Sequence, residues 1–104
     1  TAYLDMTIGG LSPREIELIR EVLRRHAEIR GAILFGSRAK GTSLLNSDID
    51  LALEGDLDPL RAEAIAAELD ALPLPYQFDV RSLPHFEHEV LRRHIERVGI
   101  RLLD

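Results

Sequence analysis

The chain contains no cysteine, which excludes disulfide bonds and thiolate metal sites. It also lacks a run of 18 apolar residues, the length that a membrane-spanning helix needs. A signal peptide is not indicated either, because the apolar stretch at residues 8–11 is too short for the hydrophobic part of one. These absences predict a cytoplasmic protein without a membrane partner.

Positive charge is scarce as well. The chain has 13 Lys and Arg residues against 18 Asp and Glu residues, a formal net charge of -5. Broad binding to nucleic acid needs a basic surface, so we expect no direct nucleic-acid binding. With 104 residues, 45% hydrophobic and 30% charged, the chain is typical of one folded domain. We assign that domain to residues 12–104, after a loose leader over residues 1–11.

Hydrophobic periodicity predicts helices alternating with short strands. The helices are expected from Ser12 to a stop at Gly31, over residues 38–40, from Asp58 to Pro73, and from Ser82 to Gly99. The strands are expected at residues 32–35, 48–54, 76–81 and 100–103. This order predicts an α/β (α+β) fold in which helices flank a small mixed sheet.

Carboxylates stand out on two of these strands. Asp48 and Asp50 are two residues apart, so they share one face of their strand. Asp is poorly suited to strands and like charges on one face repel, so the pair gains nothing in stability. Asp79 adds a third carboxylate on the strand at residues 76–81. If these strands are neighbours, the three carboxylates converge, and a hard divalent cation such as Mg²⁺ would remove the repulsion. For the first pair alone, a solvated edge strand remains an alternative.

The turn at Gly36-Ser37 joins a buried strand to a helix start. Such a turn leaves backbone N–H groups free to bind a phosphate. The Ser37 hydroxyl adds a donor, and Arg38 and Lys40 add positive charge. A tight turn before a surface helix would use the same residues. A metal-bound nucleoside triphosphate, however, would use both the turn and the carboxylates.

The spacing of these two features resembles a known signature. Gly36-Ser37, ten residues and then Asp48-Ile49-Asp50 resemble the DNA polymerase beta-type nucleotidyltransferases. More closely, GSRAKGTSLLNSDIDLAL followed by FDV is similar to the minimal nucleotidyltransferase (MNT) family. The resemblance implies the nucleotidyltransferase fold and transfer of AMP from ATP to a hydroxyl, dependent on magnesium, with two ions bound.

The resemblance also implies roles for individual residues. Asp48 and Asp50 match the carboxylates that ligate both ions. Asp79 matches the carboxylate that ligates the catalytic ion and helps to deprotonate the acceptor. Gly36 and Ser37 match the turn that holds the triphosphate, with Arg38 assisting. The loop Ser43–Asn46 departs from the family, in which this loop is often more charged or contains proline.

Many MNT proteins are antitoxins that adenylylate a tyrosine of a HEPN-domain ribonuclease toxin. The resemblance therefore implies such a toxin as partner, in a hetero-oligomer. Two alternatives stay open. The chain could neutralise a toxin by contact alone, although the three carboxylates argue against lost catalysis. It could instead modify a small molecule, although such enzymes usually need a second domain for the acceptor.

The last predicted helix carries histidines and an apolar stripe. Since no carboxylate follows a zinc-site spacing, we interpret His85, His88 and His94 as surface or partner-facing residues. The apolar stripe is expected in the core, and any excess over what the sheet can cover would be a partner interface. Its members are Val90, Leu91, Ile95 and Val98.

Overall fold

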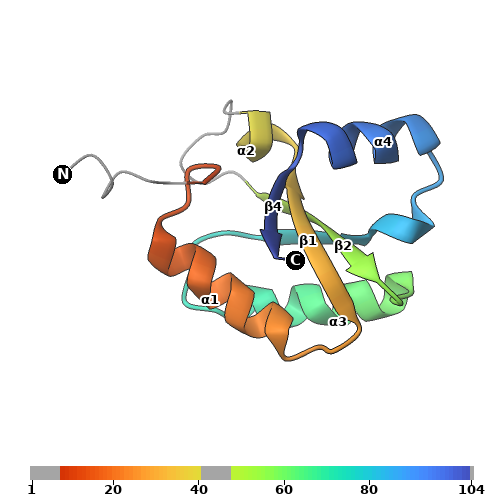
Figure 1. The fold of residues 1–104 in the computed structure, drawn as a ribbon. Helices are drawn as coiled ribbons and strands as arrows, with labels where there is room; N and C mark the ends of the chain where they lie inside the picture. The colour runs from red at the N-terminus through yellow and green to blue at the C-terminus, as the bar shows by residue number, and fades with distance from the viewer. Residues whose placement is uncertain (1–7, 41–47, 104) are drawn as a thin grey trace.

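The computed structural model describes residues 8–40 and 48–103 (Figure 1). Its centre is a four-stranded mixed sheet in the order β3-β2-β1-β4. Strand β1 runs antiparallel to β2 and β4, whereas β2 and β3 are parallel. The predicted α/β fold with a small mixed sheet is therefore confirmed. The elements are α1 (Pro13–Arg24), β1 (Ile29–Phe35), α2 (Ser37–Lys40), β2 (Ile49–Gly55), α3 (Pro59–Asp70), β3 (Phe78–Ser82), the 3-10 helix η2 (Leu83–His85), α4 (Glu89–Val98) and β4 (Ile100–Leu103).

Helices cover both faces of the sheet. In Figure 1, α1 and α3 lie below the sheet, and α2 and α4 lie above it. The side chains of β2 point alternately to the two faces of the sheet. Ile49, Leu51 and Leu53 are fully buried in the larger core with α1 and α3. Ala52 points the other way, into a smaller cluster with Ile95 of α4. Alternation along β2 thus leaves Asp50 on the α4 face of the sheet.

The first helix begins as predicted but ends earlier. Ser12 and Glu15 form a capping box, each side chain bonded to the backbone N–H of the other. The helix ends at Arg24 and not at Gly31, which lies inside β1. His26 accounts for the early end, because its buried ring bonds to Glu68 and Arg61 of α3 and holds the chain in a turn.

The last helix begins later than predicted. Ser82 belongs to β3, where its hydroxyl donates to the Leu57 carbonyl, and residues 83–85 form η2. Helix α4 starts only at Glu89, so His85 and His88 do not share a helix. Of the apolar stripe predicted for the core, only Ile95 is buried.

The predicted leader is partly packed. Ile8 and Leu11 form a β-bridge, and Leu11 is completely buried in the larger core. Residues 1–7 and the loop at 41–47, which includes the departure at Ser43–Asn46, lie outside the described residues. In the described part of the chain, no helix is long and apolar enough to cross a membrane.

Candidate active site

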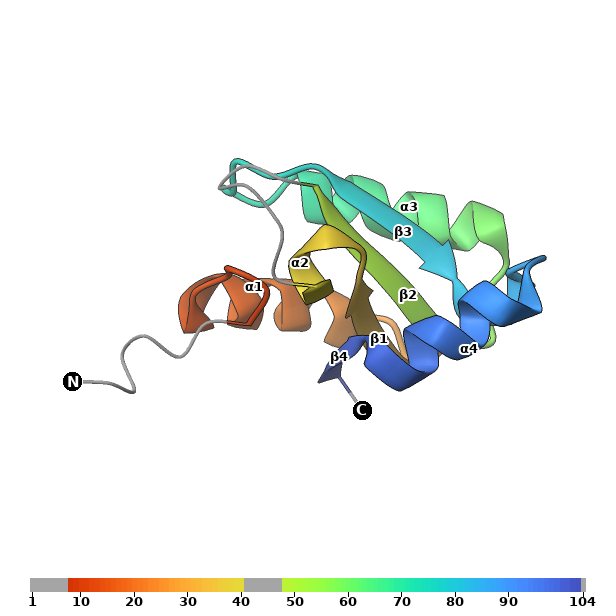
Figure 2. The same cartoon turned by 90° about the horizontal axis from the view of Figure 1, so that it is seen from above.

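The parallel pairing of β2 and β3 brings two carboxylates together. Asp50 and Asp79 are direct partners in the register of these strands, and Phe35 of β1 lies opposite Asp50 on the other side. Neighbouring strands are about 4.8 Å apart, so the two carboxylates lie side by side on one face. Asp48, which is exposed, comes just before β2. The structure thus makes β2 and β3 neighbours, as the converging arrangement requires (Figure 2).

The electrostatics of Asp50 reflect this crowding. Burial raises the pKa of Asp50 above its ordinary value, and the negative charges of Asp79 and Asp48 raise it further. Arg81 opposes the rise. Its guanidinium lies 3.3 Å from Asp79 Oδ1, on the same face of β3. A cation bound beside Asp50 would favour its ionised form, because opposite charge stabilises a carboxylate.

The donor chemistry fits a hard cation. Carboxylate oxygens are the ligands that Mg²⁺ takes, together with water and phosphate oxygens. Asp79 is paired with Arg81, and within residues 8–40 and 48–103 no three His, Asp or Glu side chains already converge as a metal centre. Asp50 and Asp79 thus supply carboxylate oxygens side by side but do not by themselves complete a metal centre.

The Gly36 turn lies directly against Asp50. Gly36 has φ +74°, a left-handed conformation that glycine adopts readily, and it ends β1. A Cβ added there would collide with Asp50 Oδ2, so only glycine allows the carboxylate and the turn to approach this closely. Ser37 then begins α2, and the Lys40 N–H donates to the Gly36 carbonyl at 3.1 Å. The predicted phosphate turn and the Asp50 carboxylate are therefore adjacent in space.

Arg38 faces inward. It is only 2% exposed, and its guanidinium donates to the Gly9 carbonyl at 2.8 Å. The same group lies over the Tyr76 ring, 4.6 Å from its centroid. These contacts tie the start of α2 to residues before α1 and before β3. They indicate that Arg38 supports the shape of the turn.

Two cavities flank the carboxylates on the α4 side of the sheet. A groove of about 590 Å³ is lined by Asp79, Arg81 and His85, and it reaches Leu91 of α4. A smaller cavity of about 330 Å³ lies between α2 and α4, beside Gly36. Arg81 was not among the predicted site residues, and Leu91 was predicted only as a core residue. The alternation of β3 could have indicated Arg81, but nothing in the sequence places Leu91 at both cavities.

Comparison with known proteins identifies the class of this fold and site. Residues 17–104 match the family model described as polymerase beta, nucleotidyltransferase. No curated protein matches the chain. Among solved structures, a chain of a toxin–antitoxin complex with AMP-PNP is 30% identical, with a TM-score of 0.71, covering 84% of this chain and 71% of that one. A chain of the MntA–HepT toxin–antitoxin complex is 26% identical, with a TM-score of 0.65 and coverage of 86% and 69%.

A third similar structure contains a modified toxin. It is the complex of a tri-AMPylated Shewanella oneidensis HEPN toxin with an MNT antitoxin, 25% identical over 86% of this chain and 69% of that one, with a TM-score of 0.65. The chain belongs to the polymerase beta-type nucleotidyltransferase family. The three similar structures are toxin–antitoxin complexes, one of them of a HEPN toxin with an MNT antitoxin, so the resemblance predicted from the sequence is confirmed.

Proposed function

We propose that this nucleotidyltransferase is the antitoxin of a HEPN ribonuclease toxin and transfers AMP from ATP to a tyrosine hydroxyl of that toxin. The observation that carries the proposal is the register pairing of Asp50 with Asp79 directly beside the Gly36 turn. Similar chains come from a complex with AMP-PNP and from one with an AMPylated HEPN toxin, which supports both the nucleotide and the acceptor class.

Each residue has a defined task in this proposal. Asp48, Asp50 and Asp79 hold magnesium, which when bound supplies the positive charge that neutralises the triphosphate and the developing charge on the acceptor oxygen. The backbone at Gly36 and the Ser37 hydroxyl hold the triphosphate in place.

The chemistry is a substitution at the α-phosphorus of ATP. The acceptor oxygen forms a bond to that phosphorus, the bond between it and the oxygen of the β-phosphate breaks, and pyrophosphate leaves. Asp79 accepts the proton of the acceptor hydroxyl, since its carboxylate borders the open groove through which an acceptor can approach. Arg81, which pairs with Asp79 at 3.3 Å, must release this carboxylate before the proton is transferred.

The test measures the intact mass of the cognate HEPN toxin after incubation with this protein, ATP and magnesium. A gain of one or more AMP units is expected, with none in EDTA or with the Asp50→Asn variant. Asp56→Asn is the matched control, because this exposed residue just after β2 carries the same charge outside the site. Its transfer rate should equal that of the unmodified protein.

The other outcomes separate the alternatives. A stable toxin complex with unchanged mass would show that the antitoxin acts by contact and would overturn the transfer step. Neither complex nor modification would remove the toxin as acceptor and point to a small molecule.

A further inference from the structure

Helix α4 presents an apolar surface to solvent. Val90 is 82% exposed, Val98 46% and Leu91 41%. Val90 and Leu91 lie in the first turn of this ten-residue helix and Val98 is its last residue, while Ile95 alone of its residues is buried. Large exposed aliphatic side chains grouped on one element are typical of an interaction surface.

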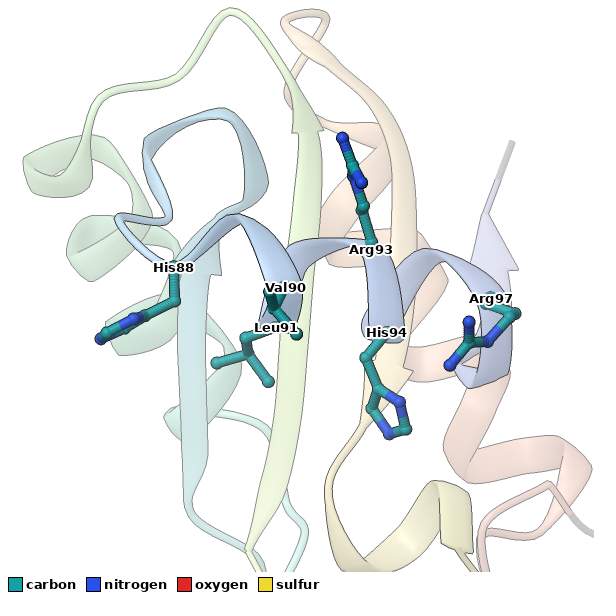
Figure 3. A pocket seen from close by; sticks show the side chains of 6 residues that line it. All are labelled: His88, Val90, Leu91, Arg93, His94 and Arg97. Carbon is teal, nitrogen blue, oxygen red and sulfur yellow. The ribbon is translucent and has the colours of Figure 1, made fainter.

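Basic and imidazole side chains border this apolar surface. A cavity of about 530 Å³ along α4 is lined by His88, Val90, Leu91, Arg93, His94 and Arg97. Figure 3 shows Leu91, His94 and Arg97 projecting to the same side of the helix, whereas Arg93 points away from them. We call these six residues the α4 surface.

The charge of the α4 surface differs from that of the whole chain. It has two arginines and no carboxylate among its six residues, although the chain has a net charge of -5. Glu89 offsets the charge of one of these two arginines, because it pairs with Arg93 at 2.8 Å. Arg97 makes no hydrogen bond or ion pair with the described residues, so its charge is available to a partner. An acidic partner with an apolar stripe is the complementary surface.

The α4 surface is continuous with the candidate active site. Leu91 lines the cavity along α4, the groove that contains Asp79 and the cavity beside Gly36. His88 is shared with the groove, and His94 with the cavity beside Gly36. A partner bound on α4 would therefore lie at the mouth of the site, where it could present an acceptor hydroxyl.

We propose that the α4 surface is the docking site for the HEPN toxin, which binds it through an acidic amphipathic helix. This inference rests on the proposed function and adds the recognition surface to it. Val90 and Leu91 provide the apolar contact, and Arg97 selects for acidic side chains. A toxin bound to the α4 surface would have its acceptor hydroxyl positioned by residues that do not hold the nucleotide.

The test compares toxin affinity of matched variants by isothermal titration calorimetry with the purified cognate HEPN toxin. Val90→Asp places an acidic residue in the first turn of α4, where it suits the helix dipole and disturbs no core contact. Leu60→Asp is its control, because Leu60 is 74% exposed on α3 and lines none of these three cavities. Val90→Asp should weaken toxin binding roughly tenfold, the loss expected for a central contact, and Leu60→Asp should not.

Charge is tested in the same way. Arg97→Gln should weaken binding about threefold and reduce its dependence on salt, since exposed ion pairs are screened. Arg14→Gln, an exposed arginine on α1, is the control and should change neither quantity.

Measuring Mg–ATP binding by the same variants separates this proposal from the proposed function. Support requires that Val90→Asp weakens toxin binding while its affinity for Mg–ATP stays that of the unmodified protein. Unchanged toxin affinity in both α4 variants would overturn docking on α4 while leaving AMP transfer intact. Failure of the unmodified protein to bind the toxin would overturn both. A dimer of the chain alone that dissociates on Val90→Asp would assign the surface to self-association and overturn docking.

Discussion

Asp50→Asn should stabilise the domain while abolishing AMP transfer. Asn has nearly the same size and can keep its place against Gly36, so the packing at the turn is retained. The substitution removes a charge that burial and two neighbouring carboxylates disfavour. Removing a like charge directly opposite in a sheet is worth about 0.5 kcal/mol, which would raise the melting temperature by about 3 °C in a domain of this size.

The stabilisation should depend on pH in a defined direction. Because the pKa of Asp50 is raised in the folded state, the folded protein binds more protons than the unfolded chain between the two pKa values. Stability of the unmodified protein therefore falls as pH rises through that window, beginning near the ordinary value of about 3.9. The gain from Asp50→Asn should be absent in more acidic solution and reach its full size at neutral pH.

Urea unfolding of both proteins across this pH range, without magnesium, measures the effect. Asp56→Asn serves as the control and should match the unmodified protein throughout. Saturating Mg–ATP should reverse the order, because a ligand at about 100 times its Kd stabilises the protein that binds it by about 2.7 kcal/mol. An Asp50→Asn protein that unfolds more easily at neutral pH would refute the reasoning, because the carboxylate would then support the fold.

Three further substitutions test the surroundings of the site. Gly36→Ala should cost about 1 to 3 kcal/mol in unfolding free energy, because the left-handed turn and the nearby Asp50 carboxylate leave no room for a Cβ, and Mg–ATP affinity measured by calorimetry should fall with it. Arg38→Lys should cost about 1 to 2 kcal/mol in urea unfolding, because an ammonium group cannot both bond to Gly9 and stack on an aromatic ring; equal stability of the two proteins would mean that the stacking adds nothing. His26→Ala should cost about 1 to 3 kcal/mol through the lost bonds to α3 and leave the AMP transfer rate unchanged, so a loss of transfer in the folded variant would contradict a purely structural role.

Local patterns were sufficient for much of the fold. The helix start at Ser12 and the strand that carries Asp50 depend on neighbours within a few residues, and both were predicted correctly. The predicted C-terminal end of α1 and the predicted start of α4 were wrong because distant contacts decide them. His26 bonds to α3, and the Ser82 hydroxyl bonds to the Leu57 carbonyl.

The sequence by itself determined the chemistry available to this protein. Three carboxylates supply the oxygen ligands that a hard cation takes, and the Gly-Ser turn supplies the backbone N–H groups that a phosphate binds, so the sequence predicted a site for both. Only the tertiary structure decided which of them meet. Asp50 and Asp79 are 29 positions apart in the sequence, and the parallel pairing of β2 with β3 makes them neighbours. The same sheet covers Ile95 of α4 and leaves Val90 of this helix in solvent. Helical periodicity alone cannot make this division, because it fixes a face of the helix but not what covers that face.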